Sequence, residues 1–529
     1  MPSYSGVWTL PAQMQAYASQ NWPQGPGAPT SVTATAGNTS ATVSFTAPSF
    51  TGVPPGITGY KAVSTPGSVT VTGASSPLTV SGLTNGTSYT FAVQALNAIG
   101  YGPASTSNSV TPINPYFMGV IKPASNNLFL PQTTTQSTST NSSNMYLVAN
   151  FQSASNGSIF NITTAGSLAI QNTLAVSGVS VYASASTVAA SGNIYMGGYY
   201  NNNAAWIVKF DSSGNITWST NTDNLIYDIA GITTDSSENI YISGRYVAGT
   251  TYGASNSRLM TAKYNSSGAI QWQKQYGSGV DGYRVGNITQ YGSLVYAVCS
   301  YQDSSYSRYG TLVAYNTSDG SINFQQSFPG NAFFDSIASS PTTGNLYISG
   351  QSTNNRSLLI KVNSSGTLQW GRQLDTGYTS TVVAIDSSEN VYRCSESNIN
   401  GYTFVLAKYD SSGTIQWQRD ISMPSTYSAQ SLNMSISANI SGGVFVTASI
   451  YDGTNYYPFV ALFPTDGSGT GSYSFNGGTF TYSAGSYTTA TDSSSFSTVS
   501  NTLTNMTRTV SSNSPSVSSA GTSLIKSSL

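Results

Sequence analysis

Histidine is absent from this chain of 529 residues, and charged residues make up only 7% of it. Without an imidazole, the chain lacks Ser-His-Asp and Cys-His catalysis, His-ligated metal sites and histidine acid–base chemistry. A net charge of −1 is not the basic footprint that nucleic acid or an anionic membrane attracts. No Walker-type loop or dinucleotide fingerprint is present. The composition therefore argues against most enzyme classes and against nucleic-acid binding.

Cysteines and long apolar runs are also scarce. Cys299 and Cys394 are too few for a disulfide framework or a zinc site, and each lies in an expected strand, where a small buried hydrophobic residue fits. The apolar stretches are far shorter than the roughly 20 residues that a membrane span needs. Residues 1–21 show no basic start followed by an apolar core, so we expect no secretory signal. Release by lysis, as for virions, is one route by which a protein without such a signal reaches the outside of the cell.

What the chain has in abundance is glycine and tyrosine, with 51 and 36 residues. Short runs of Val, Ile, Tyr and Trp alternate with clusters of Gly, Asn and Ser, a pattern typical of strands separated by turns. The length indicates more than one domain. We therefore expect an all-β protein divided into four segments, 1–28, 29–112, 113–485 and a Ser/Thr-rich tail, 486–529.

Residues 29–112 resemble a fibronectin type III domain. The most specific stretch is 83–93, where the tyrosine of that family, here Tyr89, makes the corner whose hydroxyl bonds back to the chain. Phe45 stands where the family usually has Trp, a substitution that a sandwich core tolerates. The resemblance implies an immunoglobulin-like sandwich that serves as a spacer or a binding module.

A hairpin recurs through residues 113–485. In its best copies, 206–218 and 405–417, a lysine and an aromatic residue precede Asp-Ser-Ser-Gly, and a Trp follows. The turn glycines are 46 to 54 residues apart, which suits one four-stranded propeller blade each. They are Gly166, Gly214, Gly268, Gly320, Gly366, Gly413 and Gly467. Seven such turns predict seven blades, while six and eight stay open because the first and last copies are degenerate.

These repeats resemble those of bacterial β-propellers, whose functions are mixed, so the resemblance implies a fold and says little about activity. Residues after about 486 are almost only Ser, Thr, Asn and small apolar residues. We expect part of this tail to add a strand to the incomplete first blade and to close the ring.

The two faces of such a ring differ. In an up-and-down blade, the short turns between strands one and two and between strands three and four emerge together, so the variable loops share the opposite face. Those loops hold the candidate adhesion residues Tyr199, Tyr200, Tyr301, Tyr306, Tyr309, Tyr456 and Tyr457. Tyrosine offers large contact area at low entropic cost, so we hypothesise that this face binds a host glycan or a neighbouring virion protein. The alternative is that these tyrosines simply favour strands and blade rims.

Charged residues recur at equivalent positions of different blades. Asp235 with Glu238, and Asp386 with Glu389, favour a structural role in turns; calcium binding is a weaker alternative, because two carboxylates fall short of a full ligand set. A chance glycosidase pair across the ring is a further alternative. The equivalent lysines suggest strand-edge residues that discourage pairing, or else an anion site; they are Lys209, Lys263, Lys361 and Lys408. We predict no catalytic residue, cofactor or metal.

The first 23 residues resemble the opening of structural proteins of marine, cyanophage-type myoviruses, through the run 5–10 and the pair Trp22-Pro23. The resemblance implies a docking peptide in which Trp8, Leu10 and Trp22 are apolar anchors in a partner groove. The alternative is a strand that caps the sandwich.

The sequence as a whole suggests a non-enzymatic virion protein of a phage tail, fibre or baseplate. It would lie on the particle exterior in several copies, hold other virion proteins through its N-terminal segment and present its propeller to a host-surface glycan or receptor, without contacting nucleic acid or inserting into a membrane. Alternatives are a capsid-surface decoration protein, a secreted bacterial adhesin and a polysaccharide-degrading virion enzyme.

Overall fold

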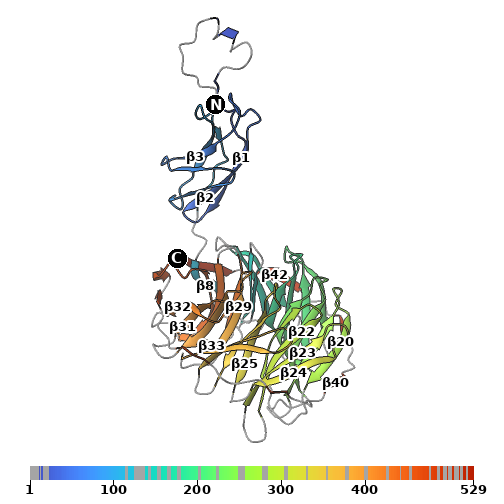
Figure 1. The fold of residues 1–529 in the computed structure, drawn as a ribbon. Coiled ribbons are helices and arrows are strands. Elements are labelled where there is room, and N and C mark those ends of the chain that lie inside the picture. Colours follow the sequence, from blue (N-terminus) through green and yellow to red (C-terminus); the bar gives the residue numbers. More distant parts are fainter. Residues whose placement is uncertain are drawn as a thin grey trace. The chain divides into compact units, whose positions relative to one another are not determined.

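The chain folds into two compact units, residues 1–115 and 116–529. A computed structural model describes residues 11, 14–15, 23–112, 117–123, 137–140, 144–151, 156–163, 168–175, 180–200, 204–221, 226–247, 257–276, 284–302, 308–328, 332–352, 356–375, 381–397, 403–423, 428–440, 443–451, 456–475, 478–484, 489–491, 497–498, 503–505, 511–512, 516–519 and 522–528. In this part of the chain, no helix is long and apolar enough to cross a membrane. The architecture is all-β (Figure 1).

The first unit is a sandwich of two antiparallel sheets. One sheet has the order β1-β2-β5 and the other β4-β3-β6-β7. The strands are β1 (Thr30–Gly37), β2 (Ser40–Thr46), β3 (Gly59–Thr65), β4 (Thr70–Gly73), β5 (Leu78–Ser81), β6 (Thr90–Leu96) and β7 (Ser105–Thr106). Every second residue of β2 and β6 is buried, as expected for strands with one face on a core.

The sandwich core confirms two expectations from the sequence. Phe45 is 8% exposed, and its ring lies 4.7 Å from that of Tyr60, so the residue fills the core position as expected. The hydroxyl of Tyr89 accepts a hydrogen bond from the Thr84 amide at 3.1 Å, which is the corner bond that the resemblance implied.

The Pro/Gly-rich stretch before the sandwich is part of it. Gln24 exchanges two backbone hydrogen bonds with Val53, of 2.9 and 3.0 Å, and the Gly27 amide donates to Phe50 at 2.8 Å. The amide of Asn97 also donates to the Gln24 carbonyl at 3.0 Å. Residues 23–28 therefore pack on the sandwich, although the sequence assigned them to the segment 1–28 that precedes it.

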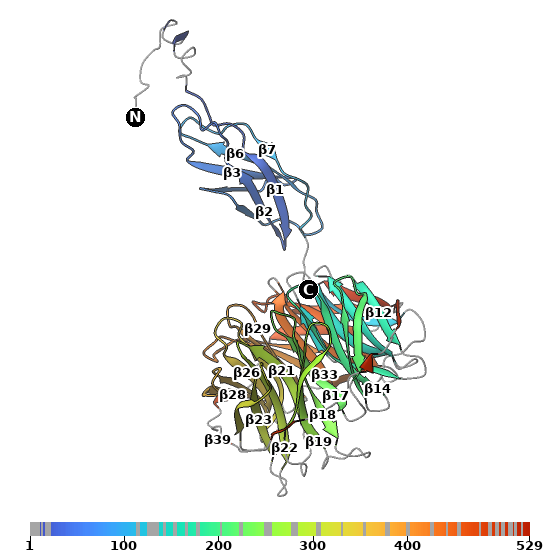
Figure 2. The same ribbon diagram turned by 90° about the vertical axis from the view of Figure 1, so that its right-hand side faces the viewer.

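The second unit is a ring of seven sheets. Figures 1 and 2 show its ribbon from two sides. Six sheets take their first four strands, from the centre outward, in sequence order. Blades 1 to 3 contain β9 (Ser137–Thr140), β10 (Asn144–Phe151), β11 (Asn156–Thr163) and β12 (Leu168–Ala175); β13 (Val181–Val188), β14 (Ile194–Tyr200), β15 (Ala205–Phe210) and β16 (Ile216–Asn221); and β17 (Ile226–Thr234), β18 (Ile240–Val247), β19 (Ser257–Tyr264) and β20 (Ile270–Tyr276).

Blades 4 to 6 follow the same plan. They contain β21 (Arg284–Tyr291), β22 (Leu294–Gln302), β23 (Arg308–Asn316) and β24 (Ile322–Phe328); β25 (Phe333–Ser339), β26 (Leu346–Gln351), β27 (Ser357–Val362) and β28 (Leu368–Leu374); and β29 (Thr381–Ile385), β30 (Val391–Ser397), β31 (Thr403–Tyr409) and β32 (Ile415–Ser422). The second and third strands are buried along nearly their whole length, because a blade lies against each of their faces.

Blade 7 closes the ring. It combines β33 (Ser428–Ile440), β34 (Gly443–Tyr451) and β35 (Tyr456–Pro464) with β8 (Phe117–Pro123), which comes from before the first blade. The sequence predicted that the tail adds a strand to blade 1 and closes the ring; the tail does add β42 (Ser516–Ser519) to blade 1, but β8 closes the ring. Blade 1 already has four strands from residues 137–175, and blade 7 is the one that lacks a fourth strand of its own.

Strands of the tail, together with two that precede it within residues 471–484, form a belt around the ring. The belt strands are β36 (Gly471–Phe475), β37 (Gly478–Ala484), β38 (Thr489–Thr491), β39 (Ser497–Thr498), β40 (Leu503–Asn505), β41 (Ser511–Ser512), β42 (Ser516–Ser519) and β43 (Thr522–Ser528). From β37 onward, each pairs with the outermost strand of a different blade, in the order 6, 5, 4, 3, 2, 1 and 7. Figure 1 labels β40 beside β20, one such pair. The belt thus covers the outer edge of all seven sheets.

Neighbouring blades contact each other where an aromatic ring of one blade packs against a turn glycine of the next. The Trp370 ring of β28 lies under the turn of blade 6, and its indole nitrogen donates to the Ser411 carbonyl at 3.2 Å. Gly413 in that turn has φ of 81°, and a Cβ atom there would lie 2.9 Å from the ring. Trp218, Trp272 and Trp417 donate to the next turn in the same way. The recurring glycine is required both by its backbone conformation and by this close approach.

Candidate functional site

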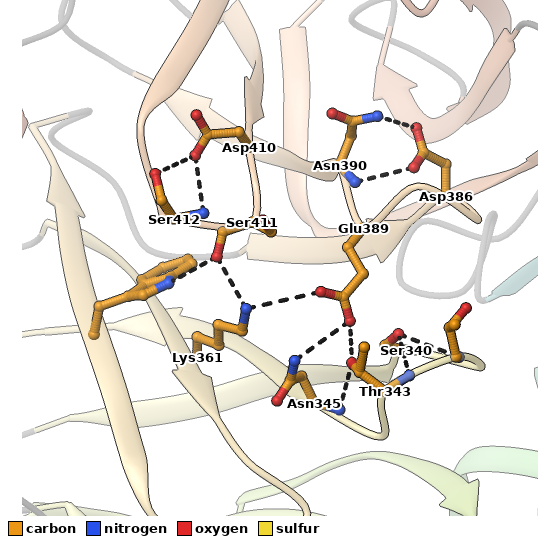
Figure 3. A network of polar contacts seen from close by, with 12 residues as sticks. Ser340, Thr343, Asn345, Lys361, Asp386, Glu389, Asn390, Asp410, Ser411 and Ser412 are labelled. Atoms are coloured by element: carbon orange, nitrogen blue, oxygen red, sulfur yellow. Dashed lines mark hydrogen bonds and ion pairs between the residues drawn. The ribbon is translucent and has the colours of Figure 1, made fainter.

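The short turns of the blades lie on one face of the ring, which we call the turn face. Lys361, on β27 of blade 5, contacts both short turns of blade 6: Glu389 in the β29–β30 turn at 3.8 Å, and the Ser411 carbonyl in the β31–β32 turn at 3.0 Å (Figure 3). One lysine reaches both turns only if they emerge together, which confirms the arrangement expected from the sequence. The opposite face, on which lie the strand ends that the longer connections join, is called the loop face.

Figure 3 shows how Glu389 joins blades 5 and 6. Its carboxylate accepts hydrogen bonds from the Thr343 hydroxyl and from the Asn345 amide, the latter at 3.4 Å, in addition to its ion pair with Lys361. Burial raises the pKa of this carboxyl, but the hydrogen bonds and the lysine outweigh burial and lower the pKa of Glu389 overall. Glu389 is therefore ionised and bound to the preceding blade.

Glu238 repeats this contact between blades 2 and 3. Its carboxylate pairs with Lys209 at 2.9 Å and accepts from the Tyr195 hydroxyl at 2.5 Å and from the Asn193 amide at 3.1 Å. Burial raises its pKa, but these partners outweigh burial and lower the pKa of Glu238 to about 2. A carboxyl that stays ionised above such a pH is poorly suited to act as a general acid.

The aspartates of the same turns are satisfied within the turn. One oxygen of Asp386 accepts from the Ser388 and Asn390 amides at 2.9 and 3.0 Å. The other accepts from the Asn390 side chain at 2.8 Å and from the Tyr392 hydroxyl at 3.0 Å. Asp235 makes the same set of bonds. This geometry agrees with the structural role that the sequence suggested. Among the described residues, no group of three or more potential ligands could hold a metal ion.

The sequence suggested that the recurring lysines are strand-edge residues, and the structure shows that this prediction is wrong. Each lies on the third strand of its blade, which is paired on both sides, and its ammonium group reaches the next blade. Lys263 donates to the Thr317 carbonyl at 2.9 Å, and Lys408 to the Thr465 carbonyl at 3.1 Å. The sequence missed this role because the contact depends on how blades stack.

Tyrosines border the loop face where strands end. Tyr199, at the end of β14, is half-buried and stacks on Tyr182 of β13 with 4.9 Å between ring centroids. Tyr456 begins β35 and is half-buried, and its ring lies 4.5 Å from that of Tyr451 across the hairpin. Tyr309 is half-buried on β23, opposite Tyr301 of β22. These tyrosines therefore occur as cross-strand pairs rather than as free loop residues.

Two of the predicted adhesion residues are buried instead. Tyr200 is 5% exposed, packs beside Trp206 and donates its hydroxyl to Asn221 at 3.1 Å. Tyr457 is 8% exposed within the core of blade 7. Both are strand residues whose neighbours, Tyr199 and Tyr456, point to the opposite side of the sheet. The sequence therefore overstated the contact surface by taking both members of each Tyr-Tyr pair as exposed.

The remaining candidates lie outside the described residues. These are the expected anchors Trp8, Leu10 and Trp22, the loop residue Tyr306 and the side chain of Tyr301. The two thiols fit the sequence prediction, because Cys299 and Cys394 are free and fully buried. Burial raises the pKa of Cys394 to about 12, so its thiol stays protonated.

Sequence reasoning overlooked the charged groups nearest the centre of the ring. Among the described residues, Asp228 on β17 and Asp335 on β25 are the carboxylates on innermost strands. Asp228 is engaged by the Arg245 guanidinium of β18, with Nε 3.0 Å from one carboxylate oxygen. Both oxygens of Asp335 are buried. A register count along the blades could have placed both aspartates on first strands.

Comparisons with known proteins support the fold. Residues 27–111 match the fibronectin type III domain, and residues 256–470 match the family described as outer membrane protein assembly factor BamB. A fibronectin type III domain is thus followed by a propeller region of the BamB and quinoprotein type. No curated protein matches the chain in sequence.

Several solved structures are similar in fold at very low identity. The polysaccharide lyase Uly1 is 8% identical with a TM-score of 0.41, covering 65% of this chain and 92% of its own. A quinonprotein alcohol dehydrogenase-like protein from Bacteroides thetaiotaomicron is 9% identical with a TM-score of 0.36, covering 76% and 94%. The exotype rhamnogalacturonan lyase YesX is 12% identical with a TM-score of 0.29, covering 82% and 72%. At these scores the likeness carries no inference about activity.

Proposed function

We propose that this protein is a non-enzymatic structural and adhesive component of a bacteriophage particle. It is exposed on a tail, fibre or baseplate in several copies. Its N-terminal segment docks to other virion proteins, the sandwich serves as a spacer, and the propeller presents its loop face to a host-surface glycan or receptor. The resemblance of residues 1–23 to myovirus structural proteins supports the assignment to a particle, with Trp8, Leu10 and Trp22 as the docking anchors.

The observation that carries the proposal is the difference between the two faces of the ring. On the turn face, Glu238 and Glu389 are ionised and bound to the preceding blade. On the loop face, cross-strand tyrosine pairs such as Tyr451 with Tyr456 border the connections between strands. Paired aromatic rings with polar hydroxyls are well suited to stack on sugar rings and to bond their hydroxyls.

Binding of the purified full-length protein to intact marine cyanobacterial cells tests the adhesive part. We expect the double variant Tyr199→Ser with Tyr456→Ser to weaken binding by about tenfold, the loss of about one aromatic anchor. The matched control is Tyr457→Phe, which keeps a buried ring and loses only a hydroxyl. Unchanged binding by the double variant would refute the role of the loop face.

A truncation separates docking from adhesion. Because residues 23–28 pack on the sandwich, the deletion should end at residue 22. We expect the truncated protein to bind cells as the full chain does and to lose its place on the particle. If neither protein binds any cell tested, a structural or decorating role is favoured over adhesion.

A polysaccharide-degrading enzyme is the second candidate, and the inner-strand aspartates are the observation that favours it. Asp228 and Asp335 lie on first strands of blades 3 and 5, toward the central axis. Release of new sugar ends from host polysaccharide, abolished by Asp335→Asn, would establish this activity. We expect no turnover, because Asp228 is neutralised by Arg245.

A further inference from the structure

Strand β8 has a special place in the molecule. It is the first described strand after the boundary between the two units, which falls between Pro115 and Tyr116. It is also the fourth strand of the closing blade, where it lies between β35 and β43. The backbone that links the sandwich to the propeller therefore enters the ring through β8.

The contact between β43 and β8 is the longest in the belt. All seven residues of β8 pair with β43, from Phe117 opposite Ser528 to Pro123 opposite Thr522. On its other side, β8 pairs with β35 at four positions, Phe117 to Val120. The other belt strands pair with their blades over only two to four positions. The belt thus makes its most extensive pairing with β8, the strand through which the chain enters the ring.

We propose that β43 is a mechanical clamp, which keeps β8 in the ring when the two units are pulled apart. This inference rests on the proposed function, in which the N-terminal segment is held by the particle while the propeller is held by a host surface. Tension between those two points passes through the chain at residue 117. The ladder with β35 alone would hold β8 by four paired residues, whereas the two ladders together hold every residue of it.

Strand β43 can resist such tension because it is itself tied to the ring. Strand β42 precedes it and pairs with β12 of blade 1 from Asn172 to Ala175. Pulling β8 and β43 together out of blade 7 would therefore also strain blade 1. Because β43 bonds through its backbone, a Ser- and Thr-rich sequence suffices for this role.

Proline substitutions can separate pairing from other effects. Strand β43 is the edge of its sheet, so successive backbone amides point alternately toward β8 and away from it. Proline is tolerated where the amide faces outward and removes a ladder bond where it faces inward. Ser523 and Lys526 are three positions apart, so their amides point to opposite sides of β43. Of Ser523→Pro and Lys526→Pro, one therefore disrupts the pairing with β8 and the other is its matched control.

Hydrogen exchange of the full-length protein reports the pairing. In the wild type, we expect the amides of residues 117–122 that bond to β35 or β43 to be protected; Pro123 has no amide hydrogen. In the disruptive variant, those that bond to β43 exchange faster, whereas those that bond to β35 keep their protection. The control variant should exchange as the wild type does. Equal exchange of β8 in both variants and the wild type would overturn the clamp.

Single-molecule pulling tests the mechanical role. The full chain is held by a tag before residue 1 and by Ser236→Cys, an exposed turn-face position in blade 3; both native thiols are fully buried. We expect the disruptive proline to shorten the lifetime of the propeller at constant force about tenfold, as loss of one or two backbone bonds would. The control should stay within about twofold of the wild type.

Two outcomes of the pulling experiment would overturn the clamp: equal lifetimes in all three proteins, or an equal loss in both variants, because proline would then act through something other than pairing. Cell binding without force separates this inference from the proposed function. Binding should be the same in all three proteins. Failure of the wild type to bind cells would refute the adhesive role, while the lifetimes would still decide the clamp.

Discussion

At the residue scale, Arg393 is the most unexpected side chain in the ring. It is fully buried on β30, where blades 3 and 5 have Ile242 and Ile348. One guanidinium nitrogen donates to the Ser357 carbonyl at 3.3 Å, while Nε and the other Nη have no partner. Its charge centre lies 5.2 Å from the centre of the Tyr409 ring. Burial lowers the pKa of Arg393, because the charged form loses its hydration.

Replacing Arg393 should therefore stabilise the protein. We expect Arg393→Met to raise the free energy of unfolding by about 1–3 kcal/mol, because a buried charge with few partners costs more than it returns. Urea denaturation of the full chain measures the change. The reverse substitution in blade 5, Ile348→Arg, should lower stability by at least as much. A loss of stability in Arg393→Met would show that the guanidinium is fully compensated.

Single residues also show what the sequence could predict. The corner bond of Tyr89 and the burial of Phe45, Cys299 and Cys394 were predictable, because each follows from a local motif or an alternating strand. The burial of Tyr200 and Tyr457 was not, because loop composition does not tell which member of an adjacent pair points inward.

At the element scale, the turn carboxylates make stability depend on pH. The pKa of Glu238 falls from 4.5, its ordinary value, to about 2 in the folded protein. Because the folded state holds this proton less tightly than the unfolded state, Glu238 contributes stability above about pH 4.5 and loses it as the pH falls toward 2. Glu389 acts in the same direction.

We therefore expect Glu238→Gln to melt at a lower temperature than the wild type at pH 7, by about one degree for a loss of about 1 kcal/mol in a unit of this size. The difference should shrink as the pH falls from 4.5 toward 2, because the unfolded state then gains a proton on this carboxyl that the folded state does not hold. Melting curves across this range measure it, with Asp375→Asn, which removes a partly exposed carboxylate that pairs with Arg356 at 3.5 Å, as control. A difference that stays constant with pH would contradict the assignment.

The blade elements were predictable for a related reason. Each turn carries its own signature, so seven copies such as those at Gly214, Gly366 and Gly413 indicate seven hairpins before any long-range contact is known. The contacts of Lys209 and Lys361 were not predictable, because they join turns about 30 residues apart in sequence whose proximity depends on blade stacking.

At the scale of the whole molecule, the belt was the largest feature that the sequence did not indicate. Residues after 486 show no alternation of apolar and polar residues, and their strands bond through backbone groups that any residue offers. With the belt in place, the outer edge of each sheet is a belt strand of only two to seven residues instead of the fourth strand of the blade. Unpaired outer edges would invite pairing between copies, which charged residues usually discourage, and this chain has few of them.

Removing the belt should therefore make the protein self-associate. A truncation after residue 484 keeps β37 on blade 6 and exposes the outer strands of the other six blades. We expect the truncated ring to form aggregates at concentrations where the full chain is dispersed, as measured by light scattering after size-exclusion chromatography. The proline variant of β43 that disrupts pairing uncovers only the edge of β8 and should aggregate far less. A truncated protein that stays dispersed would show that the edges are protected by something other than the belt, such as their strong twist.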